Sequence, residues 1–125
     1  MKFSSTLKKN NEFKRLYNKG RSSASHCVVV YCRKNGRKEN RIGFTVSTKI
    51  GGAVQRNLIR RRLKEIYRLN EYKLVSGYDL VIVARVRSRY VGYHELESSV
   101  LGLFRKLELI RSAAAVRSAV GDTSG

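Results

Sequence analysis

The spacing of the apolar residues changes abruptly between segments 41–48 and 53–69. In the first segment Ile42, Phe44 and Val46 alternate with small or polar residues, which is the period of a β-strand. In the second segment the apolar residues recur at three- and four-residue intervals, which is the period of a helix. The chain must pass from strand to helix within a few residues, which restricts it to folds that combine a sheet with helices.

Two more segments have the composition of strands. Residues 27–33 are rich in Val and Tyr, and the polar residues 34–40 that follow predict a hairpin loop leading into 41–48. Residues 79–86 are apolar almost throughout, as expected for a strand that is covered on both faces. We therefore predict that 79–86 lies in the centre of the sheet.

Two helices complete the pattern. Asn10 or Asn11 can cap a short helix that carries Phe13, Leu16 and Tyr17 and stops at Gly20, a residue suited to a left-handed C-terminal cap. Residues 93–110 place apolar side chains at alternating intervals of three and four, which predicts an amphipathic helix. The order is helix, strands, helix, strand, helix, which indicates an α+β or α/β sandwich.

The helix at 53–69 has an apolar and a basic side. Val54, Leu58, Leu63 and Ile66 are available for the core. The polar side chains that fall mostly together elsewhere on the cylinder are Arg56, Asn57, Arg60, Arg61 and Lys64.

The whole chain is strongly basic. Its 27 Lys and Arg stand against 9 Asp and Glu, for a net charge of +18 over 125 residues. Such a charge repels itself in the folded state unless a polyanion relieves it, which favours nucleic acid as the partner. No apolar run approaches a spanning helix or a secretory signal, so we expect no membrane partner and a cytoplasmic location. The length suits one domain, predicted at 1–110, with a small, polar, flexible tail at 111–125.

The positive charge is concentrated from Lys49 to Arg68. Seven basic side chains and one acidic one, Glu65, leave a net charge of +6 there. Closely spaced Arg side chains match the repeat of phosphates along a strand. A merely solvated helix face would interleave Glu with the basic residues, and a calmodulin target or membrane helix would not be flanked by strands. The stretch therefore predicts a surface that binds the phosphates of a nucleic acid.

Residues for catalysis or for a metal site are sparse. Cys27 and Cys32 are the only cysteines, too few for a four-ligand zinc site or a disulfide framework, so we expect buried thiols. A two-metal nuclease needs clustered carboxylates, yet the chain has only two Asp residues, and its seven Glu are scattered. His26 and His94 are 68 positions apart, which disfavours an acid–base pair. We predict no catalytic residue and no metal ligand in the protein.

One long segment resembles the signature of the bacterial ribonuclease P protein subunit, whose Arg-Asn-Arg-type motif lies in the basic helix. The resemblance extends over roughly residues 5–108 and includes Leu7-Lys8-Lys9-Asn10 near the start. Thr48 stands where the family often has Lys, and Leu58 and Ile59 replace a basic residue of the motif. The segment reads Arg41-Ile-Gly43-Phe-Thr-Val46-Ser47-Thr-Lys49-Ile-Gly51-Gly-Ala53-Val54-Gln-Arg56-Asn57-Leu-Ile-Arg60-Arg61-Arg62-Leu-Lys64-Glu65.

The resemblance implies a fold and a function. The fold is an α+β two-layer sandwich like domain 2 of ribosomal protein S5, in the order α-β-β-β-α-β-α, with a left-handed β-α-β crossover through the basic helix. The protein would bind the catalytic RNA and the 5′ leader of precursor tRNA and assist endonucleolytic removal of the leader. It would bind no small-molecule substrate, and the RNA would carry the chemistry with Mg²⁺ held mainly by the RNA and the substrate.

The resemblance also assigns roles to residues. The implied leader-binding cleft, between the first helix and the sheet, contains Phe13, Tyr17 and Tyr31, although core packing is the competing explanation for Phe13. The residues implied to bind RNA by neutralising phosphates are Lys49, Arg56, Asn57, Arg60, Arg61, Lys64 and Arg68.

Two alternatives stay open at this point. A ribosomal or other structural RNA-binding protein would share the charge and the fold without a processing role. A DNA-binding protein is disfavoured because no helix-turn-helix pattern with an exposed recognition helix is visible.

Overall fold

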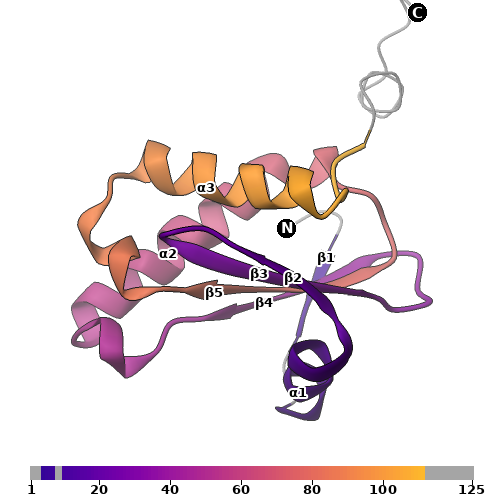
Figure 1. The fold of residues 1–125 in the computed structure, drawn as a ribbon, viewed down its shortest axis with the longest axis horizontal. Helices are drawn as coiled ribbons and strands as arrows, with labels where there is room; N and C mark the ends of the chain where they lie inside the picture. The colour runs from indigo at the N-terminus through magenta and orange to yellow at the C-terminus, as the bar shows by residue number, and fades with distance from the viewer. Residues whose placement is uncertain (1–3, 8–9, 112–125) are drawn as a thin grey trace, which may run out of the picture.

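The computed structural model describes residues 4–7 and 10–111 as a five-stranded sheet with helices on both faces (Figure 1). Short 3₁₀ helices, η1 (Thr48–Ile50), η2 (Glu71–Lys73) and η3 (Val86–Tyr90), lie in the connections. The strands and helices are β1 (Ser4–Thr6), α1 (Asn10–Lys19), β2 (Arg21–Ala24), β3 (Val28–Lys34), β4 (Asn40–Thr45), α2 (Ala53–Asn70), β5 (Tyr78–Ala84) and α3 (Tyr93–Lys106).

Strand β5 is central, as its apolar sequence predicts. The strand order is β1-β4-β5-β3-β2, with β5 parallel to β4 and antiparallel to β3. Leu80, Ile82 and Ala84 enter the core on one face, and Val81 is buried on the other. Helix α2 joins β4 to its parallel neighbour β5, so a β-α-β crossover runs through the basic helix, as the resemblance implies.

The predicted hairpin between β3 and β4 is wrong. The two strands are separated by β5, which pairs with both of them. The polar segment 35–39 does turn the chain, with Gly36 at φ 71°, but a turn does not decide which strands pair. Inserting β5 buries an apolar strand on both faces, which outweighs direct pairing of β3 with β4.

Strand β1 is an element that the sequence prediction missed. It pairs in parallel with β4 at the edge of the sheet, with Ser4 opposite Asn40. Its Ser-Ser-Thr sequence has no apolar alternation, so periodicity carries no signal for it.

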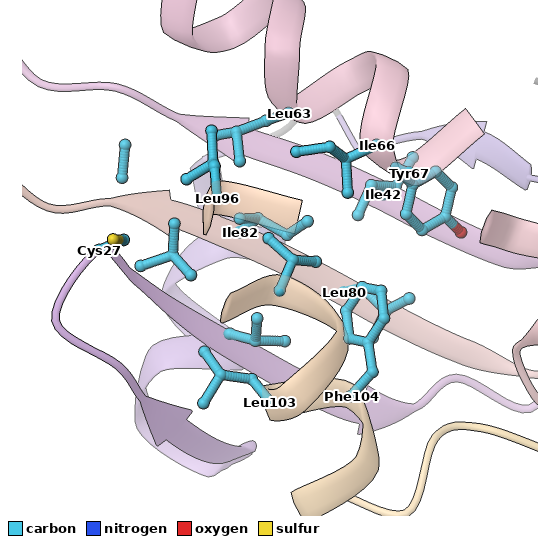
Figure 2. Close-up of a cluster of buried hydrophobic side chains, with 14 of the residues drawn as sticks. Cys27, Ile42, Leu63, Ile66, Tyr67, Leu80, Ile82, Leu96, Leu103 and Phe104 are labelled. Atoms are coloured by element: carbon cyan, nitrogen blue, oxygen red, sulfur yellow. The ribbon is translucent and has the colours of Figure 1, made fainter. Parts of the chain in front are cut away.

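The two faces of the sheet are covered unequally (Figure 1). Helices α2 and α3 form the second layer of the sandwich and enclose the main core, in which Leu63, Leu96 and Phe104 meet the sheet (Figure 2). Helix α1 lies on the opposite face and buries Leu16 against Val81 in a smaller cluster. Beside α1 this second face carries an open pocket lined by Phe13, Tyr17 and Thr45.

The inward side of α2 differs from the prediction. Its buried apolar residues are Ile59, Leu63, Ile66 and Tyr67, whereas Val54 is 83% exposed and Leu58 38% exposed. Five positions from Leu58 to Leu63 rotate the helix by about 140°, so the predicted set combined two different sides. The two exposed residues lie beside the basic side chains instead.

Gly20 ends α1 for a reason other than the predicted left-handed cap. It is not among the residues with positive φ. A Cβ atom there would lie 2.6 Å from the carbonyl oxygen of Leu16 and 2.8 Å from that of Cys32. Gly20 therefore permits the end of α1 to approach strand β3 closely.

Most of the predicted tail, residues 112–125, lies outside the described residues. Arg111, with which that prediction began, donates from its backbone N–H to the oxygen of Lys73 at 2.8 Å and from Nε to the oxygen of Leu74 at 2.9 Å. Within the described part of the chain, no helix combines the length and the apolar character needed to cross a bilayer.

We expect Gly20→Ala to lower the free energy of unfolding by about 2 kcal/mol, because the added methyl group meets two backbone oxygens that cannot move aside easily. Urea denaturation would measure the loss. Gly102→Ala is the control, since nothing lies within 4 Å of a Cβ at this position in α3, and Ala there should stabilise the helix. Equal effects of the two substitutions would contradict the role of close approach at Gly20.

Candidate nucleic-acid interface

The polar residues predicted to bind RNA on α2 share one side of the helix. At 100° per residue they occupy an arc of about 140°, which we call the basic arc. The arc lies beside the core-facing side, away from the side on which Arg62 donates to the oxygen of Val91 at 3.4 Å. The members of the basic arc are Arg56, Asn57, Arg60, Arg61, Lys64 and Arg68.

The basic arc presents donors that are only partly engaged within the protein. Arg60 donates from Nη1 to Oδ1 of Asn57 at 3.2 Å, which aligns the two side chains. The Nε of Arg56 is buried and has no hydrogen-bond partner among the described residues. Arg61 and Lys64 are exposed. A phosphate beside these groups would gain charge-assisted hydrogen bonds.

Arg68 and Lys49 differ from the other predicted contacts. Arg68 donates from Nε to Oε2 of Glu65 at 3.1 Å, and this hydrogen bond raises the pKa of the guanidinium and lowers that of the carboxyl. Arg68 is therefore partly neutralised. Lys49 is exposed in η1, which packs against α2, and so adjoins the N-terminal end of the basic arc.

The three predicted cleft aromatics come together on the opposite face of the sheet. The rings of Tyr17 and Tyr31 meet edge-on with centroids 4.8 Å apart, and Phe13 lies 6.5 Å from Tyr17. Tyr17 is 40% exposed, and its hydroxyl lies 3.3 Å from Oγ1 of Thr45 on β4. Phe13, Tyr17 and Thr45 line an open pocket together with Lys14. The pocket offers ring faces and a cation, which suits bases and phosphates of a single strand.

Gly43 makes room for this aromatic group. A Cβ at this position would lie 2.7 Å from Cζ of Phe13, so only glycine lets the ring rest on β4. Phe13 packs against the smaller core while also lining the pocket. Sequence reasoning treated core packing and a place in the cleft as alternatives for Phe13, and its ring in fact does both.

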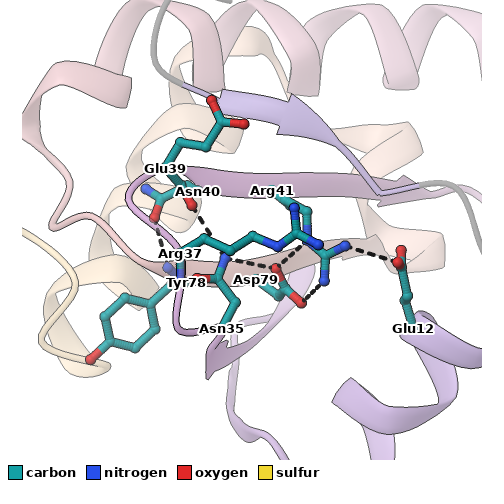
Figure 3. A network of polar contacts seen from close by, with 8 residues as sticks. All are labelled: Glu12, Asn35, Arg37, Glu39, Asn40, Arg41, Tyr78 and Asp79. Atoms are coloured by element: carbon teal, nitrogen blue, oxygen red, sulfur yellow. Dashed lines mark hydrogen bonds and ion pairs between the residues drawn. The ribbon is translucent and has the colours of Figure 1, made fainter.

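A polar network ties α1 to strands β4 and β5 (Figure 3). Arg41 on β4 binds Asp79 on β5 with two parallel hydrogen bonds of 2.8 and 2.6 Å. Its third nitrogen donates to Glu12 of α1 at 2.8 Å, and Asn35 donates to Asp79 at 2.9 Å. The Arg41 and Asp79 side chains are only 16% and 13% exposed. Sequence reasoning missed this network because its members lie in four separate segments.

The electrostatics of the network depend on ionised partners. Burial acts to raise the pKa of Asp79, but hydrogen bonds from Arg41 and Asn35 outweigh it and hold that pKa below its ordinary 3.8. The hydrogen bond with Asp79 in turn raises the pKa of Arg41. Asp79 therefore stays ionised in the folded protein at every pH at which it is ionised in the unfolded chain.

A second basic and aromatic surface, which sequence reasoning did not single out, lies at η3. Tyr90 is 68% exposed, and the Arg89 guanidinium lies 5.7 Å from its ring centroid. Arg89 also donates to the oxygen of Ile50, which places η3 against η1. Arg85 and Arg87 are exposed on the same segment. The sequence pattern that could have predicted this surface is the Arg residue at every second position from 85 to 89.

We expect the stabilisation from Asp79 to be fully present above its ordinary pKa and to be lost as the pH falls through its lower folded value. Asp79→Asn should lower the free energy of unfolding by about 3 kcal/mol at neutral pH, because Arg41 loses a buried partner. It should also flatten the dependence of stability on pH below 4. Denaturant titrations across that range would measure both effects.

Glu108→Gln is the control for this experiment, since Glu108 is exposed and outside the network. Acid sensitivity that is unchanged in Asp79→Asn would show that the network does not link stability to pH.

A sheet with a basic helix on one face and an aromatic pocket on the other is typical of the class of α+β proteins that bind nucleic acids. Comparisons with known proteins make this specific, because the ribonuclease P family model matches residues 1–108. The chain therefore belongs to the ribonuclease P family, as a protein component of that endoribonuclease, and this membership implies an RNA subunit as partner.

Curated relatives and solved structures agree with this assignment. The ribonuclease P protein component of Alkaliphilus metalliredigens is 44% identical over 110 residues, covering 88% of this chain and 99% of the relative. That of Alkaliphilus oremlandii is 43% identical over 113 residues, covering 90% and 99%. The Staphylococcus aureus RNase P protein aligns with a TM-score of 0.79 at 29% identity, covering 85% and 97% of the two chains. The Thermotoga maritima protein aligns with a TM-score of 0.74 at 29% identity, covering 81% and 96%.

Proposed function

We propose that the chain binds the catalytic RNA of ribonuclease P through the basic arc and Lys49, and the 5′ leader of precursor tRNA through the aromatic cleft. The observation that carries the first contact is the gathering of six polar residues, five of them cationic, on one side of α2. Successive turns of a helix repeat side chains about every 5–6 Å, which approximates the spacing of phosphates. The arc would neutralise and position the RNA backbone.

The proposal for the leader rests on the openness of the second sheet face. Tyr17 is the most exposed ring of the group and stands between Phe13 and Tyr31. Bases of a single strand stack on such rings without requiring a particular sequence. Lys14 beside the pocket supplies a cation for the backbone of the leader. The two RNA contacts would lie on opposite faces of the sheet.

The proposal places endonucleolytic removal of the leader on the RNA, with the protein assisting. Asp79 and Glu12 are both engaged by Arg41. The candidate metal-ligand cluster among the described residues contains a thiol and an imidazole, donors that Mg²⁺ does not favour. Mg²⁺ would therefore be held mainly by the RNA and the substrate. The protein would act in the cytoplasm, where precursor tRNA is made.

A ribosomal or other structural RNA-binding role is the alternative. The named relatives and solved structures are all ribonuclease P proteins, so they do not favour it. A cleavage assay separates the two functions. The chain should accelerate leader removal by the catalytic RNA at low Mg²⁺, where cationic side chains replace part of the screening. Cleavage of precursor tRNA by the chain alone, or no acceleration, would contradict the proposal.

We expect the double substitution Arg56→Ala and Arg60→Ala to weaken binding to the catalytic RNA and to reduce the slope of log K against log salt by about two, because two phosphate contacts are lost. Filter binding over a series of salt concentrations would measure this. The matched control removes the same charge from α3 through Arg105→Ala and Lys106→Ala, both exposed. An equal reduction of the slope in both variants would mean that the arc has no special role.

We expect Tyr17→Ala to weaken binding of the reconstituted enzyme to precursor tRNA about tenfold, because one stacking surface is lost. Its affinity for mature tRNA, which has no leader, should not change. Tyr72→Ala is the control, since Tyr72 is similarly exposed but lies in η2. Equal losses for precursor and mature tRNA would place Tyr17 outside the leader-binding surface.

A further inference from the structure

Three potential metal ligands meet at the end of the sheet where β3 begins. His26 and Cys27 lie in the turn before β3, and Glu95 lies in the first turn of α3, 69 positions after His26. Nε2 of His26 is 2.8 Å from Oε2 of Glu95. These two atoms and the Sγ of Cys27 all lie within 4.8 Å of one another.

We propose that His26, Cys27 and Glu95 form a binding site for a divalent ion of the Zn²⁺ class. The set combines an imidazole nitrogen, a sulfur and a carboxylate oxygen, and each of these donor types binds zinc in proteins. Ions that require only oxygen ligands would not select such a set. The site is separate from the proposed Mg²⁺ ions of the RNA.

The distances between the donor atoms are close to those that an ion needs. Zinc bonds of about 2.0–2.3 Å in tetrahedral geometry place ligand atoms roughly 3.3–3.6 Å apart. The pair His26 and Glu95 would open slightly from 2.8 Å, and the sulfur would move closer to the other two donor atoms by up to about 1.5 Å. The His26 and Glu95 side chains are 56% and 53% exposed, so both are free to adjust. A fourth position would face solvent.

Burial and two backbone hydrogen bonds fix the position of Cys27. It is 0% exposed, and its backbone N–H donates to Oγ of Ser25 at 3.2 Å while its carbonyl accepts from the N–H of Arg85 at 2.8 Å. Burial raises the pKa of its thiol, although a hydrogen bond with Ser99 and the charge of Arg87 oppose that rise. An ion would therefore displace a proton as it binds the sulfur.

The competing explanation is a surface hydrogen bond between His26 and Glu95 above a cysteine that only fills the core. The second cysteine allows a comparison. Cys32 is also 0% exposed, and the cation of Arg21 is its polar neighbour. Cys32 is therefore a comparison thiol that is equally buried but, among the described residues, belongs to no cluster of potential metal ligands. His94 provides a second comparison, because it is exposed beside Glu95 and does not belong to the cluster.

The test is titration of the full, reduced chain with Co²⁺ and with Zn²⁺ in the absence of RNA. We expect one ion per chain, thiolate-to-cobalt charge-transfer absorption, and an increase in Tm with Zn²⁺. His26→Asn, Glu95→Gln and Cys27→Ser should each weaken Zn²⁺ binding at least about tenfold. The matched controls His94→Asn and Cys32→Ser should bind as the unaltered chain does.

Several results would overturn the site. Binding that survives both His26→Asn and Glu95→Gln, or that falls equally in the His94→Asn control, would place the ion elsewhere. Cobalt binding without thiolate absorption would exclude Cys27 as a ligand. If Cys27→Ser fails to fold, His26→Asn and Glu95→Gln still decide the question, because both side chains lie at the surface.

Discussion

The contact between Arg41 and Asp79 fixes the relation between the sheet and the cleft. It joins two neighbouring parallel strands through paired hydrogen bonds, and the same guanidinium reaches Glu12 on α1. Helix α1 otherwise packs on the sheet through a small cluster around Leu16 and Val81. Tyr17, the ring proposed to bind the leader, belongs to this helix. Its position therefore depends on Arg41, a mostly buried cation on β4.

The excess of positive charge explains how the few acidic residues are used. Nine carboxylates face 27 cationic side chains. Two of them, Asp79 and Glu12, neutralise Arg41, a cation that is mostly buried and would be costly without partners. Much of the remaining positive charge lies at the surface, including the basic arc and the segment at η3. Binding RNA would relieve the repulsion there, so affinity and folded-state stability are linked in this protein.

Periodicity predicted the elements that depend on local pattern. The spacing of apolar residues identified α2, α3 and the buried strand β5, because each presents enough of them for its period to be visible. It did not identify the edge strand β1, and it placed Val54 and Leu58 in the core. It also paired β3 with β4, although pairing depends on which arrangement buries β5. The role of Gly20 lies in a backbone contact with Cys32, which a sequence pattern does not record.

The three candidate sites also differ in how much of each could be predicted from the sequence. The basic arc belongs to one helix, so residue spacing alone was enough to gather its members. The aromatic cleft joins α1 to β3, and a family resemblance was needed to associate its residues before the fold did. Neither residue spacing nor the family resemblance predicts the cluster of His26, Cys27 and Glu95. Its members become neighbours only because α3 packs across the start of β3. The prediction of no metal ligand was argued from the two cysteines, the scattered carboxylates and the distant histidines, and it had no means of bringing Glu95 next to His26. A site assembled by tertiary packing leaves no short-range pattern, and only the fold reveals it.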